Sequence, residues 1–135
     1  MKVVILTTTR LSRTKGAEEA VRRWADAGDE VRLVTMFKHD DPWPLAEVVV
    51  VGAPSTGGRL GRLGHALVRV FPGPVARQMA SKVKGSPAAR AALDSAEFVV
   101  AADTPAVRAV WWSSRRNPSV PHVSGLTPAL QQSRR

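Results

Sequence analysis

The fold of this chain is decided by residues 1–37, MKVVILTTTRLSRTKGAEEAVRRWADAGDEVRLVTMF. An apolar run at 3–6 leads into a polar segment at 7–16, and a second apolar run occupies 31–37. Between the two runs, apolar residues recur every three or four positions across 17–28, which is the spacing of a helix that packs one face on a sheet. The order of strand, loop, helix and strand predicts a βαβ unit, in which the two strands are parallel.

Further strands are predicted by three apolar runs, at 47–51, 98–102 and 120–124. Apolar residues follow one another at 48–51 and 98–102 instead of alternating with polar ones, which is typical of strands buried on both faces, whereas 120–124 is a shorter and more mixed segment. We therefore predict an α/β fold, a single Rossmann-like domain over 1–125 with a mainly parallel five-stranded sheet and helices on both faces. Residues 126–135 are interpreted as a basic C-terminal tail.

The composition is that of one globular domain. The 135 residues are enough for one core and too few for two domains of ordinary size. Hydrophobic residues make up 44% of the chain and charged residues 23%, which argues against a disordered protein. There is no cysteine, so disulfides, thiolate nucleophiles and cysteine-bound zinc are excluded. Because no apolar stretch is long enough for a secretory signal or a membrane span, we expect a cytoplasmic protein.

The net charge of +9 is concentrated in one part of the sequence. Residues 1–47 hold eight Lys/Arg and eight Asp/Glu, whereas residues 48–135 hold twelve and three. Such an excess favours a basic face that attracts phosphates, and the alternative is a well-solvated surface. Many of the cations accompany helical apolar spacings at 60–71 and 75–83, where we predict a membrane or partner surface. Its residues are Arg59, Arg62, Arg69, Arg77, Lys82 and Lys84.

Candidate binding residues follow three of the predicted strands. Open parallel sheets bind ligands at the carboxyl ends of their strands, so the loops after the first, third and fourth strands share one edge. The first loop is rich in hydroxyls and cations, the second in glycines, and the third holds Asp103, which begins the next helix ahead of Pro105. We predict a crevice that binds a phosphate-bearing ligand. Its residues are Thr8, Thr9, Arg10, Arg13, Gly16, Gly57, Gly58 and Asp103.

Several ligand-binding and catalytic motifs are absent. Gly16 stands alone where a dinucleotide-binding loop needs three glycines, and neither the phosphate-binding loop of NTPases nor the turn around a serine nucleophile occurs. A flavodoxin-type site, with hydroxyls at 7–14 on the flavin phosphate and Trp43 stacked on the ring, is kept as an alternative. No metal site is predicted, because residues 39–41 have no second cluster to complete a coordination sphere. His122 is interpreted as structural.

Two stretches of the chain share an order of motifs with a known family. Residues 15–35, KGAEEAVRRWADAGDEVRLVT, place a glycine before a helix and Gly-Asp-Glu-Val at its end. Residues 95–125 place a strand, a helix and a Val-Pro strand in succession. Both resemble the N-terminal domain of GT-B glycosyltransferases of the family 4 type. Asp29 stands where that family usually has histidine, and Ser124 replaces the histidine of a His-Gly pair.

The resemblance implies that the chain supplies the acceptor side of a glycosyltransferase, while a second domain holds the nucleotide sugar donor. Because the chain ends where that donor domain would begin, we expect it to bind no cofactor alone, to be inactive alone and to need a donor-domain chain as its partner. The predicted crevice would receive the acceptor, with Arg10 and Arg13 neutralising its phosphate. The resemblance also implies a peripheral location at the inner face of the membrane.

Other partners are kept as alternatives. The first is a non-catalytic module, derived from the glycosyltransferase fold, that engages a protein partner or an anionic membrane surface through residues 59–84. Nucleic-acid binding rests on charge alone, since no reading motif or series of interleaved aromatic residues accompanies the cations. A homo-oligomer is the third alternative. The apolar spacing after Asp103 predicts Ala106, Val107, Val110 and Trp111 on the inward stripe of a helix and leaves Trp112 for a contact with another subunit or domain.

Overall fold

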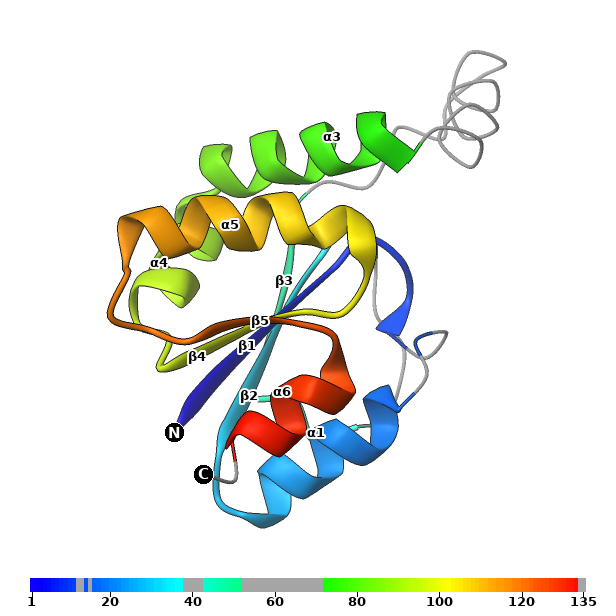
Figure 1. The fold of residues 1–135 in the computed structure, drawn as a ribbon, viewed down its shortest axis with the longest axis vertical. Helices are drawn as coiled ribbons and strands as arrows, with labels where there is room; N and C mark the ends of the chain where they lie inside the picture. The colour runs from blue at the N-terminus through cyan, green and yellow to red at the C-terminus, as the bar shows by residue number, and fades with distance from the viewer. Residues whose placement is uncertain (12–13, 15, 38–42, 52–71, 134–135) are drawn as a thin grey trace.

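Five parallel strands form one sheet in the order β3-β2-β1-β4-β5 in the part of the chain that the structure describes (Figure 1). This computed structural model describes residues 1–11, 14, 16–37, 43–51 and 72–133, with the side chains of 72–74 excepted. The strands are β1 (Lys2–Thr7), β2 (Glu30–Thr35), β3 (Glu47–Val50), β4 (Phe98–Ala101) and β5 (His122–Ser124). The predicted α/β fold and parallel sheet are confirmed.

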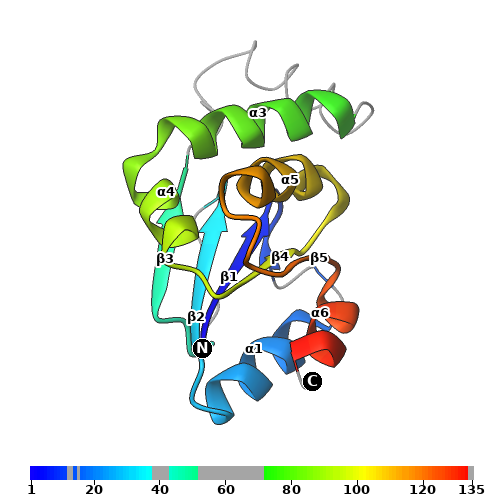
Figure 2. The same cartoon turned by 60° about the vertical axis from the view of Figure 1, so that its left-hand side comes forward.

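Helices cover both faces of the sheet and give three layers (Figure 2). One face is covered by α1 (Ala17–Asp26) and α6 (Leu126–Ser133). The other is covered by α3 (Pro72–Gly85), α4 (Pro87–Asp94) and α5 (Val107–Arg116). A single 3-10 turn, η2 (Thr104–Ala106), joins β4 to α5.

The central strand β1 explains why its apolar run is continuous. Val3 and Ile5 lie in the core on the α1 side, whereas Val4 and Leu6 lie in the core on the α3 side. All four side chains are fully buried. A strand between two helical layers needs an apolar residue at every position, because neither of its faces meets water. The sequence pattern therefore placed β1 correctly at the centre of the sheet.

The C-terminal residues are helical where a tail was expected. Residues 126–133 form α6, in which Leu126 and Ala129 are buried against the core on the α1 side. Trp24 of α1 donates a hydrogen bond from Nε1 to Ser133 Oγ at 3.0 Å. The interpretation as a tail was wrong for these residues, because Leu126, Ala129 and Leu130 follow a helical spacing that completes the layer beside α1.

The inward stripe of α5 also differs from the prediction. Ala106 and Val110 are buried as predicted, but Trp111 is 57% exposed and Val107 is exposed. Ala109 and Ser113 are buried in their place. Small residues on the buried side allow α5 to approach the sheet closely, and the two indoles are left at its flanks. Trp112 is half-buried, packs against the core, and lies 5.1 Å from the Arg116 guanidinium and 5.8 Å from Lys84 Nζ.

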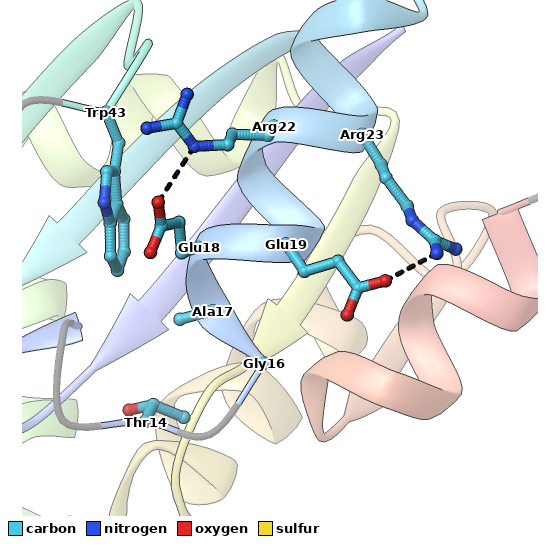
Figure 3. A pocket seen from close by; sticks show the side chains of 8 residues that line it. All are labelled: Thr14, Gly16, Ala17, Glu18, Glu19, Arg22, Arg23 and Trp43. Atoms are coloured by element: carbon cyan, nitrogen blue, oxygen red, sulfur yellow. Dashed lines mark hydrogen bonds and ion pairs between the residues drawn. The ribbon is translucent and has the colours of Figure 1, made fainter.

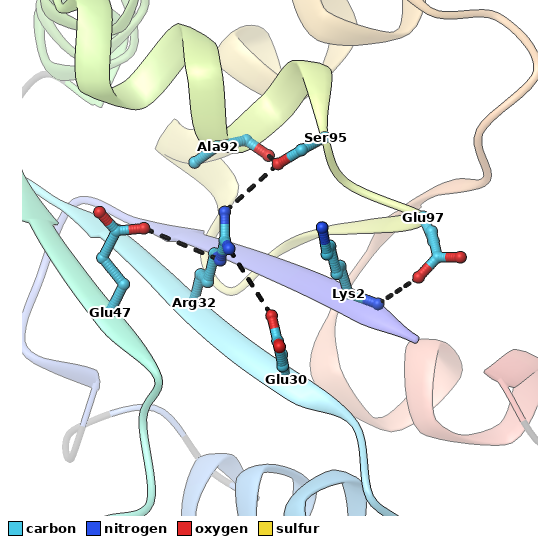
Figure 4. A network of polar contacts seen from close by, with 7 residues as sticks. All are labelled: Lys2, Glu30, Arg32, Glu47, Ala92, Ser95 and Glu97. Atoms are coloured by element: carbon cyan, nitrogen blue, oxygen red, sulfur yellow. Dashed lines mark hydrogen bonds and ion pairs between the residues drawn. The ribbon is translucent and has the colours of Figure 1, made fainter.

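A polar network joins the amino ends of two strands to the end of α4 (Figure 4). Arg32 of β2 lies 3.6 Å from the Glu30 carboxylate and 3.7 Å from the Glu47 carboxylate, and its Nη1 donates to Ser95 Oγ at 3.3 Å. The Nε of Arg32 is buried and makes no hydrogen bond. These ion pairs fasten the edge strand β3 near its start, away from the predicted crevice at the carboxyl ends.

Candidate functional site

The loops after β1 and β4 meet at the point where the strand order reverses. β1 pairs with β2 on one side and with β4 on the other, so the chain leaves β1 toward α1 and leaves β4 toward α5 on opposite faces. Open α/β sheets bind ligands at such a point. Because all five described strands are parallel, the end of β3 lies at the same edge.

Asp103 bridges these two loops with four hydrogen bonds. Its Oδ2 accepts from Thr7 Oγ1 and from the backbone N–H of Thr8, both at 2.8 Å. Its Oδ1 accepts from Thr8 Oγ1 at 2.9 Å and from the backbone N–H of Ala106 at 3.1 Å. Since Thr7 and Thr8 are buried, the carboxylate is held in place and would form a rigid floor for the predicted crevice.

The structure brings some of the predicted crevice residues together. Thr8 and Asp103 are in direct contact, and both groups of Thr8 that could donate to a ligand already donate to Asp103. Thr9 and Arg10 are exposed beside them. Gly16 lies directly before α1 with a φ of 80°, a left-handed conformation that favours glycine. Arg13, Gly57 and Gly58 lie outside the described residues.

The predicted basic surface is described in part. Arg77, Lys82 and Lys84 are exposed on α3. Arg59, Arg62 and Arg69 lie outside the described residues. The described cations share their layer with four others, Arg90 of α4 and Arg108, Arg115 and Arg116 of α5, all of them exposed. We call these seven residues the cationic layer.

A pocket of about 630 Å³ lies against the outer flank of α1 (Figure 3). The Trp43 side chain forms one wall and faces Glu18 and Arg22 across it. Thr14 and Ala17 also line it. From the sequence, Trp43 was predicted only as a stacking ring for a flavin, and the charged residues of α1 were not predicted to belong to a site. The four-residue spacing of Glu18 and Arg22 was the signal in the sequence that their side chains could pair on one face of the helix.

A smaller pocket of about 190 Å³ continues toward α6. Gly16, Glu19 and Arg23 line both pockets, and the smaller one is completed by Thr127 and other residues of α6. Glu19 and Arg23 form an ion pair that stands between the two pockets. Helix α6 therefore forms part of the pocket wall beside α1, which was not expected of a C-terminal tail.

Both ring nitrogens of His122 make contacts within the fold, which fits the structural role predicted for it. Its Nδ1–H donates to the Val120 carbonyl at 2.6 Å, and Ser113 Oγ lies 3.2 Å from its Nε2. Ser113 is buried inside α5, where no substrate reaches its hydroxyl. Burial lowers the pKa of His122 below its ordinary value of 6.5. The neutral ring therefore accepts a hydrogen bond from Ser113.

Acid should weaken the fold through His122. Its pKa is lower in the folded state, so between that value and 6.5 the unfolded chain binds more protons. The free energy of unfolding therefore decreases as the pH is lowered through this range. We expect His122→Gln to reduce this slope, by at most about 1.4 kcal/mol per pH unit for one proton. Urea unfolding at pH 5 to 8 measures the slope in both proteins. Equal slopes would contradict the assignment, because the other two histidines are common to both.

Metal and membrane features are absent from the described residues. No group of three or more His, Cys, Asp and Glu side chains among them could hold a metal ion. The residues 39–41 considered for this role lie outside the described ranges. No helix in the described ranges has both the length and the apolar character to cross a bilayer.

Comparisons with protein-family models, with curated proteins and with solved structures match nothing to this chain. The fold defines the class of protein, which is a single Rossmann-like α/β domain with a parallel sheet of order 3-2-1-4-5 among the described strands.

Proposed function

We propose that this chain is the acceptor-side half of a GT-B-type glycosyltransferase and that a separate donor-domain chain completes its active site. The observation that carries the proposal is the floor built by Asp103 at the point where the strand order reverses. A ligand on this floor would meet Thr9 and Arg10, which are exposed at its rim. The similarity of residues 15–35 and 95–125 to the family 4 type points to glycosyl acceptors among the ligands of such folds.

The arginines of the loop after β1 indicate which substrate this chain would bind and which one its partner would bind. Arg10, together with Arg13 of the same loop, would pair with an acceptor phosphate, since guanidinium groups bind phosphates with paired hydrogen bonds. The partner would hold the nucleotide sugar and close over the crevice. This chain would then bind and orient the acceptor and would bind no donor alone.

Sugar transfer by reconstituted halves tests the proposal. The purified chain is mixed with each lone donor-binding domain encoded beside its gene. Transfer of labelled sugar from UDP-glucose, UDP-N-acetylglucosamine and GDP-mannose to extracted membrane lipids is measured. We expect transfer by one mixture and none by either chain alone. A stable complex without transfer from any donor would contradict the proposal and support a non-catalytic module.

The cationic layer favours a second function, peripheral binding to an anionic membrane surface. Helices α3, α4 and α5 carry seven Lys/Arg and a single acid, Asp94, whereas α1 and α6 carry two arginines and three acids. Trp111 projects from this layer with the Arg115 guanidinium 5.0 Å from its ring. An exposed indole among arginines suits the region of lipid headgroups, where one group is apolar and the other meets phosphate.

Liposome sedimentation tests this second function. We expect binding to vesicles with 30% phosphatidylglycerol, little binding to phosphatidylcholine alone, and loss of binding at high salt. Lys82→Gln with Lys84→Gln should weaken binding about thirtyfold, at ~1 kcal/mol for each cation. Arg22→Gln with Arg23→Gln on the opposite layer is the matched control and should bind as the parent does. Retention on DNA but not on the anionic vesicles would instead favour a nucleic-acid partner.

A further inference from the structure

The α1 pocket has an aromatic wall that is held in place. Trp43 packs part of its side chain against the core on the α1 side and turns the rest toward the pocket. A ring fixed in this way loses little conformational freedom when a ligand stacks on it. The pocket volume of about 630 Å³ is within the range that holds small-molecule ligands.

The wall opposite Trp43 offers acceptors and donors side by side. Arg22 Nε lies 3.0 Å from Glu18 Oε1, and both side chains are more than half exposed. The carboxylate can accept a hydrogen bond from one hydroxyl of a ligand while the guanidinium donates to the next. Neighbouring hydroxyls on a sugar ring have this spacing and this mixture of donors and acceptors.

The charge of the pocket points to a neutral ligand. Among the described residues that line it, two carboxylates, Glu18 and Glu19, balance two guanidiniums, Arg22 and Arg23. A phosphate would meet two carboxylates as well as the arginines, and a cation would meet the arginines. A neutral ring with one apolar face and several hydroxyls suits both Trp43 and the charged pairs among the described lining residues.

We propose that the α1 pocket binds a ring of a neutral saccharide, with the apolar face of the sugar stacked on Trp43 and its hydroxyls bonded to Glu18 and Arg22. The site lies on the flank of α1 and is separate from the floor at Asp103. The proposal deepens the proposed function, on which it rests for its biological setting, because a saccharide here would be part of a glycosyl acceptor. Binding itself requires no donor domain.

Saturation-transfer NMR on the full chain tests the pocket, with maltose, cellobiose, lactose and diacetylchitobiose as separate probes. We expect at least one disaccharide to receive magnetisation and Trp43→Ala to weaken its binding about tenfold, a loss comparable with that of a good aromatic contact. Trp111→Ala removes an exposed indole from the other layer and is the matched control, with unchanged binding. Because Trp43 is half-buried, Arg22→Ala at an exposed position gives a second variant, which should also bind about tenfold more weakly.

Three results would overturn the saccharide pocket. They are no transfer to any of the four disaccharides, equal binding by the parent, Trp43→Ala and Arg22→Ala, or a preference for uridine over every disaccharide. The outcome is separable from that of the proposed function. Disaccharide binding without transfer by any donor mixture keeps the pocket and removes the transferase. Transfer by a donor mixture, with none of the four disaccharides bound by the chain, keeps the transferase and removes the pocket.

Discussion

Replacing Asp103 by alanine should lower the free energy of unfolding by about 3 kcal/mol, since it leaves several buried donors without an acceptor. The carboxylate accepts from two hydroxyls and two backbone N–H groups, and Thr7 and Thr8 are buried. Hydroxyls can rotate toward other acceptors, but the backbone N–H of Thr8 cannot. The loss would be a large part of the stability of a domain of this size.

Urea denaturation followed by circular dichroism measures this effect. Asp94→Ala is the matched control, because Asp94 is an exposed acid whose ion pair with Arg116, at 3.0 Å, should be worth less than about 1 kcal/mol. Asp103→Asn should fall between the two, since its amide keeps one acceptor oxygen and points a donor at groups that also donate. If Asp103→Ala cost no more than Asp94→Ala, the carboxylate would not be the clamp described above.

Replacing Trp24 by alanine should cost about 3 to 5 kcal/mol, the usual range for removing a large aromatic side chain from a core. Trp24 is 2% exposed, its ring centre lies 6.4 Å from that of Phe98, and its Nε1 donates to Ser133. The substitution would open a cavity between α1 and the sheet. It would also remove the hydrogen bond that ties the end of α6 to α1.

Two variants separate these contributions. Trp24→Phe keeps a ring in the core and loses only the hydrogen bond to Ser133 and part of the volume, so we expect a smaller cost of about 1 to 2 kcal/mol. Trp111→Ala removes an exposed indole and should cost about 0.5 kcal/mol or less. Equal costs for Trp24→Ala and Trp111→Ala would show that α1 is not packed as described.

The strands were predictable because most of them are continuous runs of apolar residues, which favour a buried strand. Each expected strand overlaps an observed one, and the differences are confined to the ends, as for β2, which begins at Glu30 and ends at Thr35. The start of the helical segment at Asp103 was also predictable. Its side chain accepts from the Ala106 N–H, and proline follows at a position where no backbone donor is needed.

Which side of α5 faces the core was harder to predict. The sequence offers two indoles in succession, and hydrophobicity alone favours burying Trp111. The structure instead buries Ala109 and Ser113, whose small size sets how closely α5 can pack. Arginine side chains lie beside both indoles, at distances that a linear pattern does not reveal.

The pocket on α1 could not be assembled from sequence because its walls are distant in the chain. Glu18 and Arg22 are recognisable as a helical pair, but nothing in the sequence places Trp43 opposite them. The contact between Thr8 and Asp103 was equally hidden. Both residues were expected at one edge of the sheet. The sequence could not show that the backbone N–H and the hydroxyl of Thr8 both donate to the Asp103 carboxylate.

The central position of β1 also determines how late in synthesis the sheet can be fully paired. Thr8 and Asp103 are 95 residues apart in the sequence. A nascent chain therefore emerges with its first strand long before that strand's second neighbour, β4, has been synthesised. Joining such distant partners closes a very long loop, which slows folding. The edge that would receive a ligand is thus finished only after most of the chain has left the ribosome.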